Sequence, residues 1–271
     1  MPAVQLTQLK AQINDLLWQY TRPEELLKSV HQLFELYSFR VLRTGKGVQP
    51  SDLIPTYHIP PMVQYQLEVA LAQQCAENPG VALPLADALW EDPYLEIRQI
   101  ATFLLGQIPL DPPDPVLSRL QDWCRPDENK KVLKAALEKG STRLCRDMPD
   151  KWLELVSNWI NTTEIPWQSM GLKGLLPLIE NREFENLPPI FRLVSPLIQT
   201  SRQELQTDLL AVIDALASRS PTETFFLLRQ LLNLGATTSA HRLIRRTLPS
   251  FPAVEAARLR EVLKQFSARS S

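Results

Sequence analysis

Cysteine and histidine are scarce in this sequence, and each occurs only three times. The cysteines are odd in number, widely spaced and without a CxxC pair, a pattern typical of free thiols in a cytoplasmic protein. A zinc site that used Cys124 and Cys145 would need further ligands, and the only histidines are His31, His58 and His241. We therefore expect no bound metal and no cofactor.

Long hydrophobic runs are missing as well. No segment approaches the roughly 20 consecutive apolar residues of a membrane span, and the N-terminus lacks the charged-then-apolar pattern of a secretory signal. The formal net charge is only −1, so the chain as a whole has no general attraction to DNA. We expect a cytoplasmic monomer that does not bind membranes.

Signals for β-structure are also absent, whereas helical signals are abundant. There is no stretch of period-two alternation and no Asn-Gly or Asp-Gly hairpin turn. In residues 91–109, EDPYLEIRQIATFLLGQIP, Asp92 and Pro93 are residue types that begin a helix. Apolar residues then recur at steps of three and four, which places them on one helix face.

Similar units recur along the whole chain. Four small residues fall within predicted helices at intervals of roughly 34 to 40 residues, the period of helix-pair solenoids, where they let the next helix approach closely: Ala101, Ala135, Gly171 and Ala211. The sequence predicts an all-α fold, a curved α-solenoid of antiparallel helix pairs. Residues 1–43 would form an N-terminal helical hairpin, residues 44–60 a linker loop and residues 61–271 the repeat array.

The six tryptophans fall into two groups. Four lie on apolar stripes and are predicted to be buried: Trp18, Trp90, Trp152 and Trp159. Trp123 lies at a predicted helix end and Trp167 near a helix start. Either residue could pack in the core or present an exposed stacking surface.

Two clusters of basic residues stand out against the neutral background. The first lies between residues 125 and 146 and the second on the predicted helix 238–248; their central members are Lys130, Lys131 and Lys134, and Arg242, Arg245 and Arg246. Each cluster is either a solvated helix face or part of a groove for phosphates, where every contact adds salt-dependent affinity.

Two stretches carry a resemblance to known proteins. Residues 91–106 are similar to the second helix of a HEAT repeat. Residues 85–105, LADALWEDPYLEIRQIATFLL, resemble the bacterial HEAT-like alkylpurine DNA glycosylases of the DNA alkylation repair family, which carry Leu-Trp, Pro, Glu and Ala at the positions of Leu89, Trp90, Pro93, Glu96 and Ala101. Residues 149–176 resemble a second family segment through Trp159, Ile160 and Trp167.

This resemblance covers most of residues 60 to 250 and implies a chemical site. In the family, catalysis is implied by an aromatic cleft, a carboxylate and an arginine. The aromatic side chains stack on the DNA sugar and backbone, and the carboxylate stabilises the sugar cation that forms as an alkylated base leaves. The Trp-Trp-Asp run of the family is absent here; Trp123 is present, the nearest carboxylates are Asp127 and Glu128, and Met170 stands at the position of the arginine. Two of the three chemical parts are therefore missing from the expected positions.

Three functions are compatible with this pattern. The first is a HEAT-like DNA alkylation repair protein that binds duplex DNA on its concave face through Trp123, Trp167 and the two basic clusters, without strong glycosylase activity. The second is a scaffold that binds a protein partner on the same face. The third is an active alkylpurine DNA glycosylase with a relocated carboxylate, for which Asp127 and Glu128 are the candidates.

Overall fold

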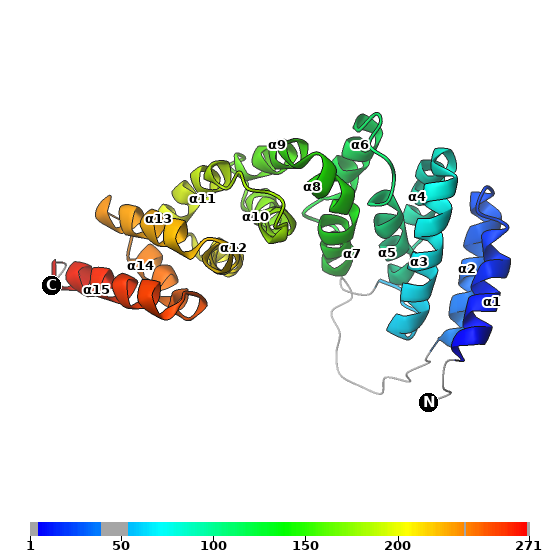
Figure 1. Ribbon diagram of the computed structural model, residues 1–271, viewed down its shortest axis with the longest axis horizontal. Coiled ribbons are helices and arrows are strands. Elements are labelled where there is room, and N and C mark those ends of the chain that lie inside the picture. Colours follow the sequence, from blue (N-terminus) through cyan, green and yellow to red (C-terminus); the bar gives the residue numbers. More distant parts are fainter. Residues whose placement is uncertain (1–4, 39–53, 236, 270–271) are drawn as a thin grey trace. The chain divides into compact units, whose positions relative to one another are not determined.

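The computed structural model describes residues 5–38, 54–235 and 237–269 (Figure 1). All regular structure in these ranges is helical, and they contain no strand. The prediction of an all-α fold is therefore confirmed. None of the described helices combines the length and the apolar character that crossing a membrane requires.

The chain forms two compact units, residues 1–147 and 148–271. The helices of the first unit are α1 (Leu6–Leu17), α2 (Pro23–Tyr37), α3 (Pro61–Glu77), α4 (Ala82–Trp90), α5 (Leu95–Leu105), α6 (Asp114–Trp123), α7 (Lys130–Ala135) and α8 (Thr142–Asp147), with a 3₁₀ turn η2 (Pro79–Val81) and a π-helical turn η3 (Ala136–Gly140). Helical periodicity in the sequence predicts one helix over residues 129–139, which corresponds to α7 and η3, and the sequence pattern missed α8.

Contacts between successive helices arrange the first unit in two rows. Helix α3 packs between α1 and α5, and α5 packs against α7 and η3, while α4 packs against α2 and α5. The apolar stripe predicted within residues 91–109 is buried: Ile97, Ile100 and Leu104 are fully covered. Helix α5 therefore contacts four neighbouring elements, α3, α4, α7 and η3.

A polar network fastens the N-terminal hairpin to α5. The Nε2 atom of His31 on α2 lies 2.8 Å from Oδ2 of Asp92, whose Oδ1 accepts a hydrogen bond from the Tyr94 N–H at the start of α5. The buried carboxylate of Glu96 accepts the backbone N–H groups of Tyr57 and His58. Residues 54–60, the described part of the predicted linker, therefore pack against α5. Residues 44–53 lie outside the described residues, and the predicted domain boundaries stay a prediction.

The second unit is built from α9 (Pro149–Ile160), α10 (Ile165–Glu180), α11 (Pro188–Thr200), α12 (Gln206–Arg219), α13 (Pro221–Asn233), α14 (Thr238–Arg246) and α15 (Ala253–Arg269), with two 3₁₀ turns, η4 (Gln203–Leu205) and η5 (Leu248–Ser250). Helix α10 packs against α9 and α12, and α13 packs against α11 and α15. Proline occupies one of the first two positions of α9, α10, α11 and α13, where its missing N–H costs no helical hydrogen bond.

Small residues permit close helix contacts at three of the four predicted positions. Ala101 is fully buried and Ala135 nearly so. A Cβ atom at Gly171 would lie 2.6 Å from Cγ1 of Ile160, which explains why α9 and α10 approach closely there. The prediction was wrong for Ala211, whose side chain is exposed on α12.

The tryptophan predictions were correct for two of the four residues. Trp152 and Trp159 are buried, and Nε1 of Trp152 donates a hydrogen bond to the Gly174 carbonyl oxygen. Trp90 is half-buried. Trp18 is 87% exposed because it follows the last residue of α1, on the side away from Leu16 and the rest of the buried stripe.

Candidate nucleic-acid interface

An open groove of about 370 Å³ lies on the first unit between α3, α5, α7 and η3. Three lysines, two glutamates and one aromatic ring are among its lining side chains: Pro61, Gln64, Tyr65, Glu68, Gln99, Lys131, Lys134, Ala135, Glu138 and Lys139. We call it the α3–α7 groove. It brings three residues of the first predicted basic cluster, Lys131, Lys134 and Lys139, onto one surface with residues that lie far away in the sequence.

The ion pairs within the groove decide how much positive charge it offers. Nζ of Lys139 lies 2.6 Å from Oε1 of Glu68, whose side chain is only 9% exposed, so these two charges offset each other. Lys134 lies 3.7 Å from Glu138, and both side chains are more than half exposed, so water screens that pair. Lys131 is exposed at the groove wall and adds the surplus positive charge.

The start of α7 holds these lysines in place. The Asn129 side chain accepts a hydrogen bond from the Lys131 N–H at 2.9 Å and caps the helix. Lys130 is exposed on the same helix but is not part of the groove lining. The predicted interface residues Lys130, Lys131 and Lys134 therefore all face solvent, and two of them border the groove.

A three-layer stack lies on the same unit, at the position where the family resemblance implies a site. The rings of Trp90 and Trp123 are parallel within 2° with centroids 4.3 Å apart, and the Arg98 guanidinium lies 4.1 Å from the Trp90 centroid. Arg98 also forms a two-point ion pair with Glu128, at 2.9 and 2.6 Å. An aromatic pair, an arginine and a carboxylate thus meet, but they bind one another.

This arrangement changes the interpretation of the predicted stacking and catalytic residues. Trp123 is only 5% exposed, so it packs in the core and offers no open stacking surface. The charge of Glu128 is offset by Arg98. Asp127 is exposed and does not line the α3–α7 groove. The neighbouring thiol of Cys124 is buried, and burial together with the nearby Glu128 raises its pKa, which argues against a nucleophilic role.

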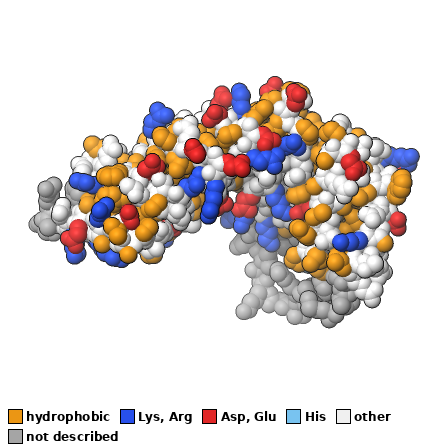
Figure 2. All heavy atoms as spheres, in the orientation of Figure 1, with side chains coloured by type: hydrophobic (Ala, Val, Ile, Leu, Met, Phe, Trp, Pro, Cys, Tyr) orange, Lys and Arg blue, Asp and Glu red, His pale blue; other side chains and the backbone are white. Residues whose placement is uncertain are grey.

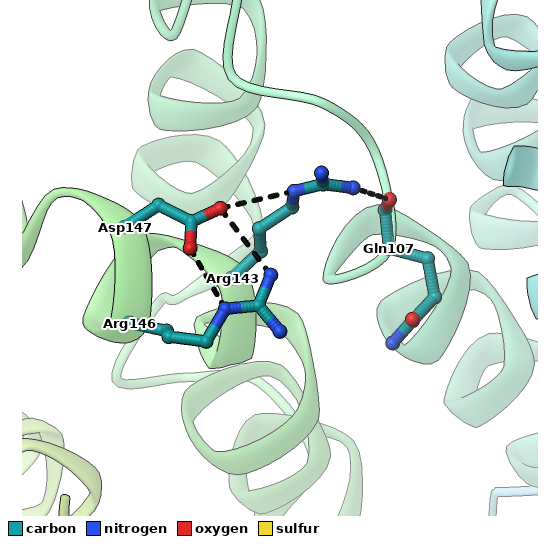
Figure 3. A network of polar contacts seen from close by, with 4 residues as sticks. All are labelled: Gln107, Arg143, Arg146 and Asp147. Carbon is teal, nitrogen blue, oxygen red and sulfur yellow. Dashed lines mark hydrogen bonds and ion pairs between the residues drawn. The ribbon is translucent and has the colours of Figure 1, made fainter.

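Other cations of the first cluster are held by polar contacts in and near α8 (Figure 3). Arg143 donates to the Gln107 carbonyl oxygen at 2.7 Å and to Asp147, and Nε of Arg146 donates to the same carboxylate at 2.7 Å. These hydrogen bonds, first that from Arg146 and then that from Arg143, hold the pKa of Asp147 below its usual value. Arg143 and Arg146 therefore contribute less free positive charge than the sequence pattern suggested.

The second unit carries the second basic cluster on α14. The side chains of Arg242, Arg245 and Arg246 are all exposed. Burial, and then the charge of Arg245, lower the pKa of the adjacent His241. The two clusters belong to separate units, so the expectation that they face one concavity stays a prediction.

The second segment of the resemblance lies on α9 and α10. Trp167, in the first turn of α10, is half-buried, so part of its surface is accessible. Met170 is 1% exposed and packs in the core. Of the two tryptophans predicted at the DNA interface, Trp167 therefore retains an accessible surface, whereas Trp123 does not.

A second groove of about 480 Å³ lies between α10 and α12. It is lined by residues of both charges and by small side chains: Leu176, Ile179, Glu180, Arg182, Ala211, Asp214, Ala215, Ser218 and Arg219. Arg219 donates to the backbone oxygens of Arg182 and Phe184, and Asp214 accepts a hydrogen bond from Ser250. This groove has no surplus of cations.

Sequence reasoning missed Tyr65 and Glu68 of the α3–α7 groove and the pairing of Lys139 with Glu68. Tyr65 and Glu68 lie on α3, more than 60 residues before α7, and no signal in the sequence joins them to the lysines. Lys139 belongs to the first basic cluster, but its pairing with Glu68 depends on the packing of α3 near η3. Figure 2 shows basic and acidic side chains interspersed on the face drawn.

One comparison with known proteins supports the family that the two resembling stretches suggested. Residues 69–246 match the family described as "DNA alkylation repair enzyme". No curated protein and no solved structure matches the chain. The matched segment extends from α3 to the end of α14 and includes the α3–α7 groove lysines, the Trp90–Trp123 stack and both basic clusters. The chain belongs to the DNA alkylation repair enzyme family.

Proposed function

We propose that the protein binds duplex DNA and has little or no glycosylase activity. The chain would be a cytoplasmic, monomeric HEAT-like solenoid whose concave face carries the DNA. The supporting observation is the exposed lysine surface of α7 at the α3–α7 groove, within the segment that matches the family. The order of contacts, α3 to α5 to α7 and α10 to α12 to α14, is typical of one row of helices in such a repeat.

Phosphate contacts supply the affinity in this proposal. Lys130, Lys131 and Lys134 lie within five residues on one helix and are all exposed, so their side chains can reach neighbouring phosphates. Each phosphate that is neutralised releases counterions from duplex DNA, so the binding constant falls steeply with salt. Arg242, Arg245 and Arg246 would add contacts from the second unit.

The expected lack of strong glycosylase activity follows from the stack around Trp90. Departure of an alkylated base leaves positive charge on the sugar, and a carboxylate must lie free beside that charge to stabilise it. Glu128 is already paired with Arg98, and Trp123 is covered by Trp90. Glu128 and Trp123 are therefore engaged in packing, and the exposed Asp127 is the remaining candidate carboxylate.

Fluorescence anisotropy with a labelled duplex tests the binding proposal. Reversal of the cluster by Lys130→Glu, Lys131→Glu and Lys134→Glu should weaken binding and reduce the slope of log K against log salt by roughly 0.9 for each phosphate that is no longer neutralised. The same reversal of exposed lysines in the N-terminal hairpin and α9, at Lys10, Lys28 and Lys151, is the control. Equal weakening by both triple variants would show that only net charge matters and would count against this interface.

An excision assay on methylated duplex DNA tests the catalytic part. We expect little release of methylated purine. Excision that disappears in Asp127→Asn but persists in Glu128→Gln would favour the third hypothesis, an active glycosylase whose carboxylate has moved to the exposed Asp127.

A protein partner is the second candidate occupant of this surface. Helix α3 exposes an apolar stripe next to the groove, with Met62 48%, Tyr65 58% and Val69 48% exposed. Apolar patches rimmed by charge are typical of protein interaction sites. A scaffold function predicts that Met62→Ser and Val69→Ser weaken capture of a partner while duplex binding stays absent in all variants.

A further inference from the structure

The α3–α7 groove places an exposed aromatic ring opposite basic side chains, and we propose that it holds an unpaired nucleotide of single-stranded DNA. The base would stack on Tyr65, and the adjoining phosphates of the strand would contact Lys131 and Lys134. This inference rests on the proposed DNA binding and specifies the structure of the preferred DNA. It also assigns a role to Tyr65, which the resemblance to the family does not imply.

The first wall of the groove is α3, and Tyr65 is the aromatic side chain of its lining. The tyrosine is 58% exposed although it belongs to a helix whose other face is buried through Val63, Leu67 and Leu71. A planar ring that remains accessible at a groove wall can receive a base. Stacking of a base on an aromatic side chain strengthens binding and depends little on which base is bound.

The second wall is α7 with the start of η3. It carries Lys131, Lys134 and Lys139. Lys139 is paired with the buried Glu68, whereas Lys131 is exposed and Lys134 makes only the screened contact of 3.7 Å with Glu138. Lys131 and Lys134 are therefore the lysines that can exchange water or a weakly bound partner for a phosphate.

The floor of the groove offers amide groups between these walls. Gln64 on α3 and Gln99 on α5 line the groove, and Nε2 of Gln64 lies 3.0 Å from Oε1 of Glu68 and 3.4 Å from Oε1 of Gln99. Amide groups can donate to and accept from a sugar or a base edge. The volume of about 370 Å³ falls at the lower end of the range that accommodates small ligands, about 300–1,000 Å³.

An unpaired strand fits these features better than a paired duplex or an apolar peptide. In a duplex the base faces are covered by their neighbours, so Tyr65 would have no base to stack on. An apolar peptide would be expected to use the whole exposed stripe of α3, but Met62 and Val69 do not line the groove. The groove combines one aromatic ring with cations, the combination by which single strands are bound without sequence readout.

Binding of three labelled DNAs to the full chain tests this inference: a single-stranded oligothymidylate, a duplex with a central unpaired thymidine bubble, and a fully paired duplex. We expect the single strand and the bubble to bind more tightly than the paired duplex. Tyr65→Ala should weaken binding of the first two by about tenfold, the equivalent of one stacked base, and leave the paired duplex unchanged. Tyr65→Phe should restore the affinity, because the ring is kept.

Two matched variants serve as controls. Phe226→Ala removes an aromatic ring of similar exposure, 54%, from α13 in the other unit and should leave all affinities unchanged. Lys131→Glu should weaken binding of all three DNAs. Circular dichroism of each variant verifies that it is folded.

The results separate this inference from the proposed duplex binding. Paired duplex that binds as tightly as the bubble, or Tyr65→Ala that weakens all three DNAs equally or none, would overturn the stacking role while duplex binding stands. An acidic peptide that displaces the oligothymidylate more strongly than unlabelled oligothymidylate does would reassign the groove to a protein. Absence of binding to every DNA would overturn both proposals.

Discussion

Arg98 and Glu128 form a two-point ion pair in which Nη1 lies 2.9 Å from Oε1 and Nη2 lies 2.6 Å from Oε2. The pair connects α5 to the residues just before α7, and Oε1 of Glu128 also accepts the Asn129 N–H at 2.7 Å. The same guanidinium covers the Trp90 ring. The pair therefore fixes the orientation of the lysine-bearing helix and neutralises a carboxylate near the position expected for catalysis.

Removal of one partner should be costly because the side chains are only 16% and 17% exposed. Arg98→Ala leaves Glu128 without its cation, and we expect the free energy of unfolding to fall by about 1–3 kcal/mol, between the values for exposed and fully buried pairs. Arg119→Ala is the control, since its pair with Asp87 is 33% and 38% exposed and should contribute less than about 1 kcal/mol. Urea unfolding measures the free energy of unfolding of both variants. Equal decreases in the two variants would contradict the proposed effect of burial.

Gly106→Ala should destabilise the first unit. The new Cβ would lie 1.9 Å from the Lys139 carbonyl oxygen, which is backbone and cannot move without shifting η3. We expect a loss of about 1–3 kcal/mol or more. A Cβ at Gly80 meets nothing within 4 Å, so Gly80→Ala should be neutral or stabilising by up to about 1 kcal/mol. Thermal denaturation of the two variants measures both effects.

Ala101→Leu should also be destabilising, whereas the identical change at Ala211 should not. Ala101 is fully buried in α5 against its neighbours, and overpacking of a close helix contact costs about 1–3 kcal/mol. Ala211 is exposed at the groove between α10 and α12 and has room for a larger side chain. Differential scanning calorimetry should show a lower Tm for Ala101→Leu alone. A decrease in Tm of the same size for Ala211→Leu would indicate a close contact at α12.

Stability should fall at alkaline pH through the buried thiols. Burial raises the pKa of Cys145 from 9.0 to about 12, so the unfolded chain releases this proton at lower pH than the folded chain. The thiol's contribution to stability is therefore complete below about pH 9 and is lost as the pH rises to about 12. Cys145→Ala should reduce the slope of unfolding free energy against pH by about 1.4 kcal/mol per unit within this window. If Cys145→Ala leaves the slope of unfolding free energy against pH unchanged between about pH 9.5 and 10.5, folding does not raise the pKa of this thiol.

The sequence by itself was sufficient for most of the helices, although its pattern missed α8. Proline at the first turns and apolar residues at steps of three and four act within a single helix, so their effect is readable without the rest of the fold. The family also followed from two local stretches, 85–105 and 149–176, which fall within the match over residues 69–246.

Only tertiary structure decided which side chains are accessible and which charges are free. Trp18 and Trp123 both lie at helix ends, but one projects into solvent and the other stacks on Trp90, because only the second has a neighbouring helix to cover it. Likewise, the α3–α7 groove joins Tyr65 to Lys131 across 66 residues of chain. Periodicity tells which face of a helix is apolar, but the identity of its neighbours depends on packing between distant segments, and that packing determines the candidate site.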